Sequence, residues 1–577
     1  MPKRLRWLIA EKDPGAGEHL ARALGIGRLA ARVLCARGLG DPAAARSFLD
    51  PSLDGLHDPA RLLDMPAAIS RLRDAIARGE SILIYGDYDV DGATSVVILK
   101  KAIEMAGGQA TFHVPHRLRE GYGMRPEVVD AAAESGVRLI ISVDTGIRAA
   151  EAVRRANERG IDVIITDHHL PEAELPPALA VLNPNRPGCP YPEKNLCGVG
   201  VAFKLVQGLL AAVDWPAEKR QRVIESFLKV VAIGTVADVV PLTGENRVIV
   251  KHGLNGLRSV RNPGLRALLD VAGFTGDSIP SATQVAFRIA PRLNAAGRMD
   301  TADSVIELLL TADAGRAREL ARQLHEWNVE RQQAEARVVE EIVEACARSP
   351  VDDSRRALVF AADAWHRGVL GIVASRLVER FHRPVFVLSR NPEDGLAQGS
   401  GRGVPRFHLL EALEAMPELF VKFGGHQHAA GVTLAAGQVD AFRERLNAYA
   451  CERLSPEDLA PEMEIDAVAD LAELTEESVA EVLALGPFGC GNPLPLFAAR
   501  NVEVAAPPVL WKEKHLRVAV KSNGRPLWLK AWNFAGRAPE LAPGVRVDIA
   551  FSLEEDPYSA GRGYAPWAAV LRDFRPA

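Results

Sequence analysis

The sequence comprises 577 residues, which at about 150 residues per domain corresponds to roughly three or four domains. A hydrophobic content of 48%, a charged content of 25% and a formal net charge of −5 exclude a protein that binds nucleic acid through overall positive charge. The six cysteines include no CxxC pair, which argues against a zinc knuckle, and no stretch reaches the roughly 18 apolar residues of a membrane-spanning helix. We therefore expect a cytoplasmic protein that does not enter a membrane.

The first part of the chain predicts a helical lead followed by an α/β domain. Residues 1–50 carry apolar residues at helical spacing. Short apolar strands are then expected at residues 81–86, 110–115, 138–144 and 162–167, separated by helices at 93–108, 126–136 and 149–160. This alternation predicts a doubly wound parallel sheet, in a domain that we place at residues 51–311.

The second half predicts a bridging helix and two further domains. Residues 312–348 lack proline and are rich in Ala, Arg and Glu, which indicates a long helix connecting two domains; a simple solvated helix is compatible with the same pattern. A β-α-β pattern restarts and predicts a second α/β domain at residues 349–455, followed by a linker at 454–462. Residues 460–577 are strand-like with Gly and Pro between the strands, which suits a C-terminal OB-fold β-barrel.

Acidic residues follow the first predicted strand. The segment YGDYDVDGATS (residues 85–95) carries Asp87, Asp89 and Asp91 at alternate positions. In an extended loop these three side chains would point the same way, and Gly92 would permit a tight turn into the next helix. A single loop of this kind is often only a turn or a helix cap.

The pattern recurs at later strands. Asp144 ends IISVD, Asp167 and His168 end VIITDHH, and Asp238 lies beside the apolar run VVAIGTVA. The carboxyl ends of strands in an open α/β sheet face one crevice, so these acids are expected to gather there. Carboxylates with one or two imidazoles suit Mn²⁺ or Mg²⁺, and several shared acids indicate two ions about 3.5–4 Å apart.

These segments resemble the motifs of a known superfamily. DYDVDGATS, VDTG, TDHHLP and GTVADVVPL are similar, in order, to the four motifs of the DHH phosphoesterases. APRLNAAGRM, WHRGVLGIVASRL, GSGRGV and FGGHQHAAGV extend the resemblance to the single-strand-specific exonucleases of the RecJ family, with their DHHA1-type second domain. It covers about residues 50–570 and makes residues 51–311 the expected catalytic DHH domain.

The resemblance implies a two-metal site. Acid or histidine stands at every expected ligand position, which argues against a degenerate, non-catalytic relative. One ion would be held by Asp87, Asp89 and Asp144, and the other by Asp91, Asp144, His168 and Asp238, with Asp144 bridging. Asp167 would orient a ligand, and His169 would stabilise the phosphate or donate a proton, which completes an expected catalytic set of Asp144, Asp167, His168 and His169.

Three further segments carry candidate phosphate ligands. Arg117 follows a strand, Arg292 and Arg298 lie in PRLNAAGRM, and Ser400 and Arg402 alternate with glycine in GSGRG. An isolated GSGRG is often a flexible turn, but glycine beside Ser and Arg also permits close approach to a phosphate. The resemblance implies that Arg117, Ser400 and Arg402 bind a terminal 5′-phosphate and that His426 contacts a substrate phosphate, although a zinc role for His426 is an alternative.

The C-terminal segment LWLKAWNF predicts a strand with two faces. Trp528, Lys530 and Trp532 would share the face opposite Leu527 and Leu529. Core packing of the two indoles is one interpretation; stacking on unpaired bases, worth about 1–3 kcal/mol per base, is the other.

The leading hypothesis is a metal-dependent exonuclease that degrades single-stranded DNA from the 5′ end to 5′-mononucleotides, in DNA recombination and repair. The 5′ polarity, the expected partners (single-strand binding protein and a RecQ-type helicase) and a monomeric state rest on the resemblance. The alternatives are a phosphodiesterase for nanoRNA or cyclic dinucleotides, a haloacid-dehalogenase-type phosphatase, for which the DHH triplet has no use, and a non-catalytic DNA-binding scaffold.

Overall fold

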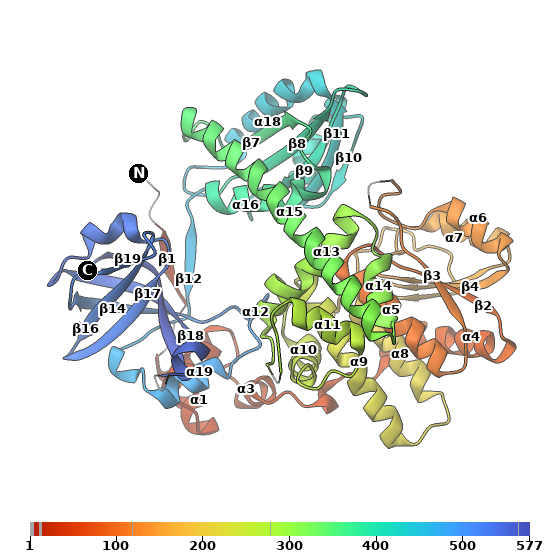
Figure 1. The fold of residues 1–577 in the computed structure, drawn as a ribbon, viewed down its shortest axis with the longest axis horizontal. Helices are drawn as coiled ribbons and strands as arrows, with labels where there is room; N and C mark the ends of the chain where they lie inside the picture. Colours follow the sequence, from red (N-terminus) through yellow and green to blue (C-terminus); the bar gives the residue numbers. More distant parts are fainter. Residues whose placement is uncertain (1–4, 11–13, 118, 277, 563–564) are drawn as a thin grey trace.

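The computed structural model describes residues 5–10, 14–117, 119–276, 278–562 and 565–577. Two α/β domains and a C-terminal β domain surround a long central helix (Figure 1), which confirms the fold class predicted from the sequence. Within the described residues, no helix is long and apolar enough to cross a membrane.

The first domain is built on a parallel sheet with the strand order β3-β2-β4-β5-β6. From β2 the chain crosses to β3 on one side and then returns to β4 on the other, so the ends of β2 and β4 form a topological switch point. The strands are β2 (Ser81–Tyr85), β3 (Ala110–His113), β4 (Val137–Val143), β5 (Asp162–Thr166) and β6 (Ala180–Leu182).

Helices cover both faces of this sheet, as the alternation of β2 shows. Ile82 and Ile84 belong to the core shared with α4, α5 and α8, whereas Leu83 and Tyr85 pack with α6 and α7. These helices are α4 (Met65–Arg78), α5 (Val90–Met105), α6 (Pro126–Glu134), α7 (Ala150–Glu158) and α8 (Gly198–Ala211). The domain continues with α9 (Ala217–Ala237), α10 (Gly244–Gly256), α11 (Pro263–Val271), α12 (Ala282–Gln284), α13 (Ala290–Met299) and α14 (Asp303–Leu310).

The central helix α15 (Ala314–Arg348) belongs to two cores. Near its start, Leu320 and Leu324 pack into the first domain, and near its end Val338 and Ile342 pack into the second. Between them Glu335 is fully buried and pairs with Arg331 of the same helix and with Arg376 of the second domain. The helix therefore determines how far apart the two α/β domains lie.

The second domain is a mixed sheet in the order β10-β11-β9-β8-β7. Only β7 and β8 are parallel; the other pairs are antiparallel. The strands are β7 (Leu358–Asp363), β8 (Val385–Asn391), β9 (Leu396–Arg402), β10 (Lys422–Gly425) and β11 (Ala429–Ala435), and the helices are α16 (Leu370–Phe381), α17 (Leu409–Glu414) and α18 (Val439–Arg453).

The C-terminal domain is an OB-type sheet that closes on itself. Neighbouring strands run β14-β18-β19-β17-β16, and β14 also pairs with β16, which joins the two ends of the run. The pairing of β17 with β19 is parallel. The bounds are β13 (Ala467–Val468), α19 (Glu476–Leu483), β14 (Leu496–Val504), β15 (Val509–Trp511), β16 (His515–Ser522), β17 (Arg525–Ala531), β18 (Arg546–Glu555), α20 (Pro557–Ala560) and β19 (Trp567–Pro576).

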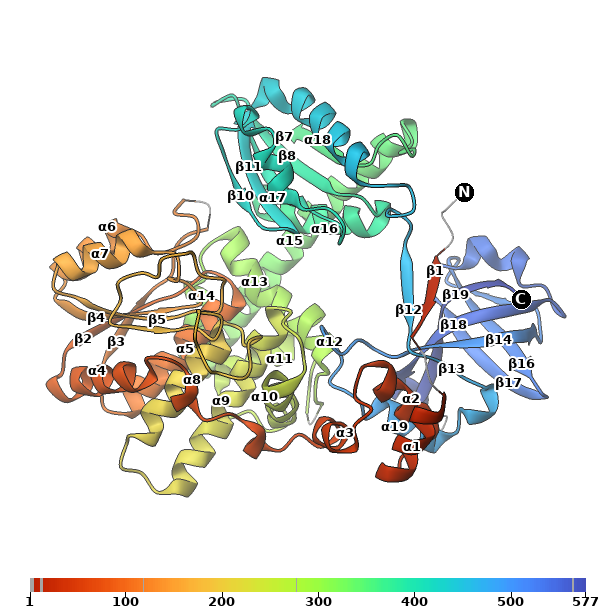
Figure 2. The same cartoon turned by 180° about the vertical axis from the view of Figure 1, so that it is seen from behind.

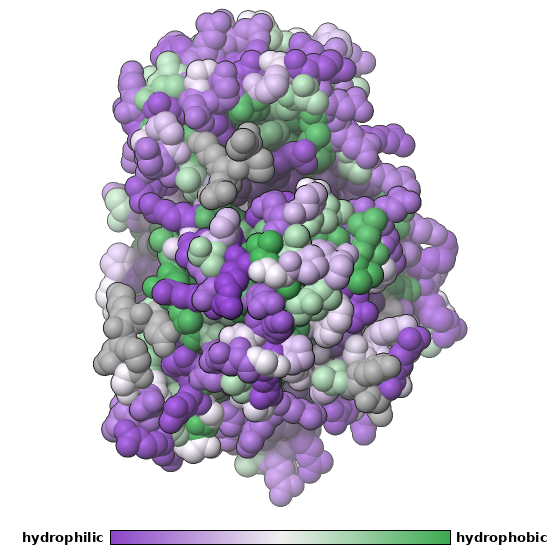
Figure 3. Space-filling view, turned by 90° about the vertical axis from the view of Figure 1, so that its left-hand side faces the viewer, coloured by the Kyte–Doolittle hydropathy of each residue, from purple (hydrophilic) through white to green (hydrophobic). Residues whose placement is uncertain are grey.

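The N-terminal residues pack against this C-terminal domain (Figure 2). Leu20 and Leu34 share a core with Phe497 and Phe551 of the β domain, and β1 (Arg6–Ile9) pairs with β12 (Glu462–Ile465) at the end of the segment expected to be a linker. The helices are α1 (Pro14–Leu24), α2 (Arg28–Ala36) and α3 (Pro42–Leu49). Nothing in the N-terminal sequence indicated this packing. The side of the molecule that carries the β domain, on the left in Figure 1, is largely hydrophilic, with apolar residues in small groups (Figure 3).

One buried arginine connects three segments that are distant in sequence. Arg247 of α10 is 1% exposed, and its guanidinium donates to the carbonyl oxygens of Phe48 (2.7 Å), Leu485 (3.0 Å) and Gly486 (2.7 Å). Burial lowers the pKa of Arg247 to about 10, which leaves it charged at neutral pH. This side chain of the first α/β domain thereby holds the N-terminal helices and the β domain together.

We expect Arg247→Ala to lower the free energy of unfolding by about 2–4 kcal/mol, because charge-assisted hydrogen bonds worth about 1.5–3 kcal/mol each are lost together and their carbonyl acceptors stay buried. Urea denaturation measures the midpoint of the first transition. Arg258→Ala, at an exposed arginine just after the same helix, is the control and should change stability by less than about 0.5 kcal/mol. Equal midpoints for the two variants would contradict this role.

Candidate functional site

The acidic residues after β2 do not form the extended loop that their alternate spacing predicted. Helix α5 begins at Val90, three residues earlier than expected, with Asp89 as its N-cap: the Asp89 carboxylate accepts from the Gly92 amide at 3.0 Å. Asp91 therefore lies in the first helical turn and joins a different group of ligand atoms from Asp87 and Asp89. The prediction that all three carboxylates point the same way was wrong. Successive side chains rotate by about 100° around a helix axis, whereas they alternate between two opposite sides of a strand.

Gly92 has a different role from the one expected. It is inside the helix, and a Cβ atom there would lie 2.5 Å from the Asp87 carbonyl oxygen. The glycine is thus required for the close approach of the Asp87 backbone to α5 and not for a turn.

Asp91 is held by the N-terminus of α8. Its two carboxylate oxygens accept from the amides of Gly198 (2.6 Å) and Val199 (2.8 Å), groups that carry the partial positive charge of a helix start. A Cβ at Gly198 would lie 2.5 Å from the side chain of Asp144, so this glycine lets two acids approach the same helix end. The glycines in CGVGVAFK were the available signal, and the sequence interpretation did not use them.

Asp144 and Asp87 each have a buried, unpartnered oxygen. Asp144 follows β4 with a positive φ of 58° and is 2% exposed; its Oδ1 accepts no well-oriented hydrogen bond among the described residues, although Nε2 of His168 lies 3.2 Å away. Oδ1 of Asp87, which is 4% exposed, likewise has no hydrogen-bond partner among the described residues. Buried carboxylate oxygens without donors are costly unless a cation occupies the space between them.

The three residues that end β5 have three different environments. Asp167 is fully buried and accepts from the backbone amides of Ile147 (2.9 Å) and His168 (2.7 Å) and from the ring of His169 (2.7 Å). His168 turns inward, with Nε2 at 3.2 Å from Oδ1 of Asp144. His169 is 36% exposed and faces the crevice.

Asp238 does not follow a strand. The apolar run before it forms the last turns of α9, and Asp238 is the C-cap of that helix, with its carboxylate 3.8 Å from His168 Nε2. The ligand atoms thus form groups within 4.8 Å, in which Asp144 and His168 each take part twice: Asp87, Asp89 and Asp144; Asp91, His168 and Asp238; Asp144, His168 and His169. Oxygen-rich groups with imidazole nitrogen fit Mn²⁺ or Mg²⁺.

The charges in these groups repel one another. Burial and then the neighbouring Asp89 raise the pKa of Asp91 to about 7, and burial with Asp91 and Asp89 raises the pKa of Asp238 to about 9. Burial and the charge of His169 lower the pKa of His168 to about 4, which keeps its imidazole neutral and able to ligate. Burial opposes a charge on His169, but the hydrogen bond and charge of Asp167 raise its pKa above the ordinary value.

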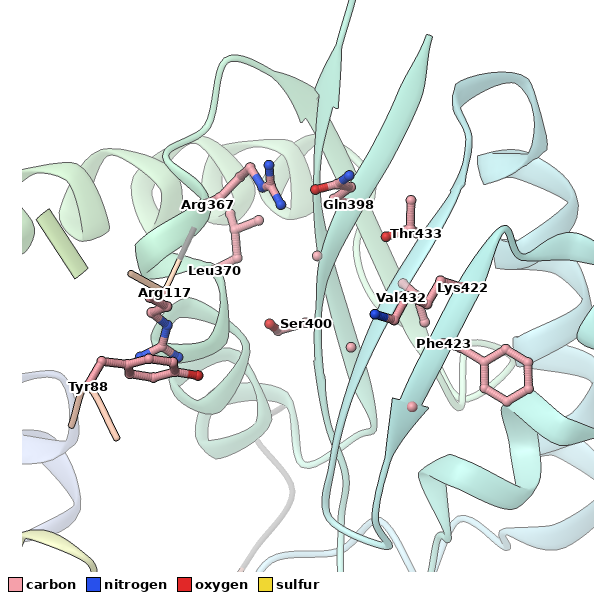
Figure 4. Close-up of a pocket in the computed structure, with 13 residues that line it drawn as sticks. Tyr88, Arg117, Arg367, Leu370, Gln398, Ser400, Lys422, Phe423, Val432 and Thr433 are labelled. Atoms are coloured by element: carbon pink, nitrogen blue, oxygen red, sulfur yellow. The ribbon is translucent and has the colours of Figure 1, made fainter. Parts of the chain in front are cut away.

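A cavity of about 430 Å³ lies between the two α/β domains (Figure 4). Tyr88 and Arg117 come from the first domain, with the guanidinium 4.8 Å above the Tyr88 ring, and Ser400 faces them from β9. Arg367 and Lys422 also line the cavity; neither was among the predicted phosphate ligands, although Arg367 stands in the WHRG segment.

Two more of the predicted arginines lie beside this cavity. Burial and then Arg117 lower the pKa of Arg298, to about 9, and that of Arg402. Arg298 donates to the Gly368 carbonyl at 2.9 Å, and Arg402 to the Gly401 carbonyl at 2.8 Å. Cations crowded in this way are well suited to bind an anion.

The other two predicted phosphate ligands are placed differently. Arg292 donates to the Arg288 carbonyl of its own helical turn and is not among the described residues that line the cavity. His426 is exposed on the turn between β10 and β11. Burial and then the charges of Arg148 and His169 lower the pKa of His426, so this turn lies near those two residues of the first domain.

On the β domain, Trp528 is 49% and Trp532 39% exposed, on the face opposite Leu529. Lys530 between them pairs with Asp556 at 2.7 Å, so part of its charge is already neutralised. Trp511, which was not among the predicted residues, lies 5.0 Å from Trp532, and Arg517 lies above Trp528. The aromatic face is thus wider than the segment LWLKAWNF indicated.

Three family models match successive parts of the chain: the DHH family, N-terminal domain (residues 81–235), the DHHA1 domain (355–452) and the RecJ OB domain (465–563). The chain is 39% identical over 552 residues to the single-stranded-DNA-specific exonuclease RecJ of Bacillus subtilis (strain 168), over 95% of this chain and 68% of that protein. The chain is 38% identical to the single-stranded-DNA-specific exonuclease RecJ of Escherichia coli (strain K12), over 82% of this chain and 84% of that protein. The crystal structure of RecJ from Thermus thermophilus in complex with Mn²⁺ matches with a TM-score of 0.84 and 31% identity, over 100% of this chain and 80% of that chain.

The raised carboxyl pKa values predict how metal affects stability. The folded, metal-free protein binds protons more tightly than the unfolded chain, so its stability falls as pH rises from about 4 through 7 to 9. A bound divalent ion offsets the repulsion. We therefore expect Mn²⁺ to raise the melting temperature more at about pH 8.5 than at about pH 6.

Asp144→Asn, which removes one charge at nearly constant volume, should lose most of the metal-dependent increase in calorimetric melting temperature. Asp74→Asn, at an exposed position of α4, should keep it. An increase of the same size in both variants, or one that is larger at the lower pH, would refute the assignment.

Proposed function

Because the chain belongs to the RecJ family of single-stranded-DNA-specific exonucleases, we propose that it is a metal-dependent nuclease that hydrolyses single-stranded DNA. The observation that carries this proposal is the position of a cation-lined cavity of about 430 Å³, shared by both α/β domains, beside a buried carboxylate cluster. An anionic strand end in the cavity would place a phosphodiester near the acids.

The cofactor in this proposal is a pair of Mn²⁺ or Mg²⁺ ions, the metals bound in two structures of the Thermus relative. Asp87, Asp89 and Asp144 would hold one ion, and Asp91, Asp144, His168 and Asp238 the other. When bound, such ions would supply a water of lowered pKa and would neutralise charge on the phosphate. Asp167 holds the ring of His169 through its 2.7 Å hydrogen bond and so presents the opposite ring nitrogen to the crevice.

Polarity is proposed to come from the cavity. Arg117, Ser400 and Arg402 would take a terminal 5′-phosphate, so that digestion proceeds 5′ to 3′ and releases 5′-mononucleotides, in DNA recombination and repair. Arg298 supports the same anion, and the exposed Trp528 and Trp532 would stack on unpaired bases of the approaching strand.

The remaining parts of the proposal rest on the family alone: a cytoplasmic monomer that works with single-strand binding protein and a RecQ-type helicase. A phosphodiesterase for nanoRNA or cyclic dinucleotides is less supported, because the chain also carries the OB-type domain.

Asp144→Ala should reduce digestion of single strands more than about 100-fold in Mn²⁺ or Mg²⁺, since loss of a ligand costs more than the 10- to 100-fold typical of its supporting residues. Time courses with 5′- and 3′-labelled strands measure both rate and polarity, and a dinucleotide is the comparison substrate. Undiminished digestion by the variant would refute the site assignment. Release of label from the 3′ end would refute the 5′ to 3′ polarity, and a preference for the dinucleotide would refute the proposed substrate class.

Arg402→Ala should reduce the preference for a 5′-phosphorylated over a 5′-hydroxyl strand by about 10- to 100-fold, the value of one charge-assisted hydrogen bond. The ratio of kcat/KM for the two strands measures it. Arg406→Ala, at an exposed arginine paired with Asp458, is the control and should leave the ratio unchanged. A ratio that is the same in both variants would remove Arg402 from the terminal-phosphate site.

A further inference from the structure

An exposed tyrosine reaches the edge of the carboxylate cluster. Tyr122 lies in the loop between β3 and α6 and is 53% exposed. Its hydroxyl oxygen is 3.2 Å from Nδ1 of His169 and 3.4 Å from the carbonyl oxygen of Asp144, and its ring meets the His169 ring edge-on at 5.7 Å. The chain thus places a neutral hydroxyl between two residues of the proposed metal site.

Among the described residues, the proton of this hydroxyl has only weak or neutral acceptors. Nδ1 of His169 is 2.7 Å from Asp167, a distance at which the ring donates to the carboxylate and has no lone pair left for Tyr122. The Asp144 carbonyl at 3.4 Å is long for an O–H donor. The Thr145 hydroxyl can donate to the Tyr122 oxygen or accept its proton, but it is a neutral partner that a charged phosphate oxygen would displace. The O–H group is therefore available to a ligand in the crevice.

The loop around Tyr122 is anchored on both sides. Glu120 accepts from the His116 amide at 2.8 Å, and the hydroxyl of Tyr85 donates to the Gly123 carbonyl at 3.1 Å. Gly121 and Gly123 flank the tyrosine with φ values of 81° and 99°, a conformation that favours glycine. The tyrosine is therefore held in place by its neighbours, and it does not depend on its contacts with the acids.

The same loop also carries a residue of the proposed binding site for the terminal phosphate. Arg117 lines the terminal-phosphate cavity, and Tyr122, five positions later, lies at the metal cluster. In the proposed complex, one short segment would thus face both phosphates that flank the first nucleotide of the strand.

We propose that Tyr122 is a catalytic residue, whose hydroxyl donates a hydrogen bond to a non-bridging oxygen of the scissile phosphate. The inference rests on the proposed nuclease function. As the water oxygen bonds to phosphorus, the bond from phosphorus to the 3′ oxygen of the first nucleotide breaks and a proton goes to that oxygen. Tyr122 keeps its own proton and stabilises the charge that grows on the non-bridging oxygen, where a fixed donor has its largest effect.

Tyr122→Phe tests this role because it removes only the hydroxyl. We expect kcat to fall about 10- to 100-fold, somewhat less than for loss of an oxyanion-hole donor, with KM changed by less than about threefold. Sulfur substituted for one non-bridging oxygen accepts a hydrogen bond poorly. One phosphorothioate diastereomer should therefore slow the wild-type protein but cause no further loss in Tyr122→Phe, while the other diastereomer affects both proteins equally.

Two controls separate this role from the alternatives. Tyr558→Phe, at an exposed tyrosine of α20, should match the wild type. The Mn²⁺-dependent increase in melting temperature should be intact in Tyr122→Phe; its loss would overturn the inference, because the tyrosine would then act through Asp144. An unchanged kcat, or the same sulfur effect in both proteins, would also overturn it. A wild-type protein without nuclease activity would instead refute the proposed function, and the inference with it.

Discussion

Electrostatic repulsion among buried acids is the constraint around which the first domain is organised. Five carboxylates and two imidazoles converge where β2 and β4 end, in a region where Asp87, Asp91 and Asp144 are almost without solvent. In a low-dielectric interior such charges cannot coexist without compensation. The fold supplies part of it through the amides at the start of α8, and it leaves the rest to cations, as the unpartnered oxygens of Asp87 and Asp144 indicate.

Opposite charge gathers beside the cavity between the two α/β domains. After burial, the charge of Arg117 is the next cause that lowers the pKa of Arg298 and of Arg402. Each cluster is unfavourable alone, and each is complementary to one part of a metal-bound phosphodiester. Their separation depends on α15, which is packed into both cores and carries the buried Glu335 between them. The packing of α15 therefore fixes the distance between the two charged clusters, while the charges themselves attract the ligand.

The β domain is attached through contacts that involve both ends of the chain. The N-terminal helices complete its core, and Arg247 connects them to α10 through buried carbonyl groups. The exposed aromatic face of this domain is thus held at a defined place relative to the crevice, which a flexible linker alone would not achieve.

The sequence by itself determined the layers, the long helix and the identity of the candidate ligands, because periodicity and strand-end acids reflect local backbone geometry. It did not determine which way each side chain points. Asp91 turned toward α8 because Asp89 capped the helix early, and Asp238 came from a helix end. Arg298 bonded to the Gly368 carbonyl of the second domain, whereas Arg292 bonded to the Arg288 carbonyl close to it in sequence. Only the tertiary structure decided these side-chain directions, together with the roles of Tyr122 and Gly198. Each of them depends on the packing of elements that lie far apart in the chain, and no local sequence pattern encodes that packing.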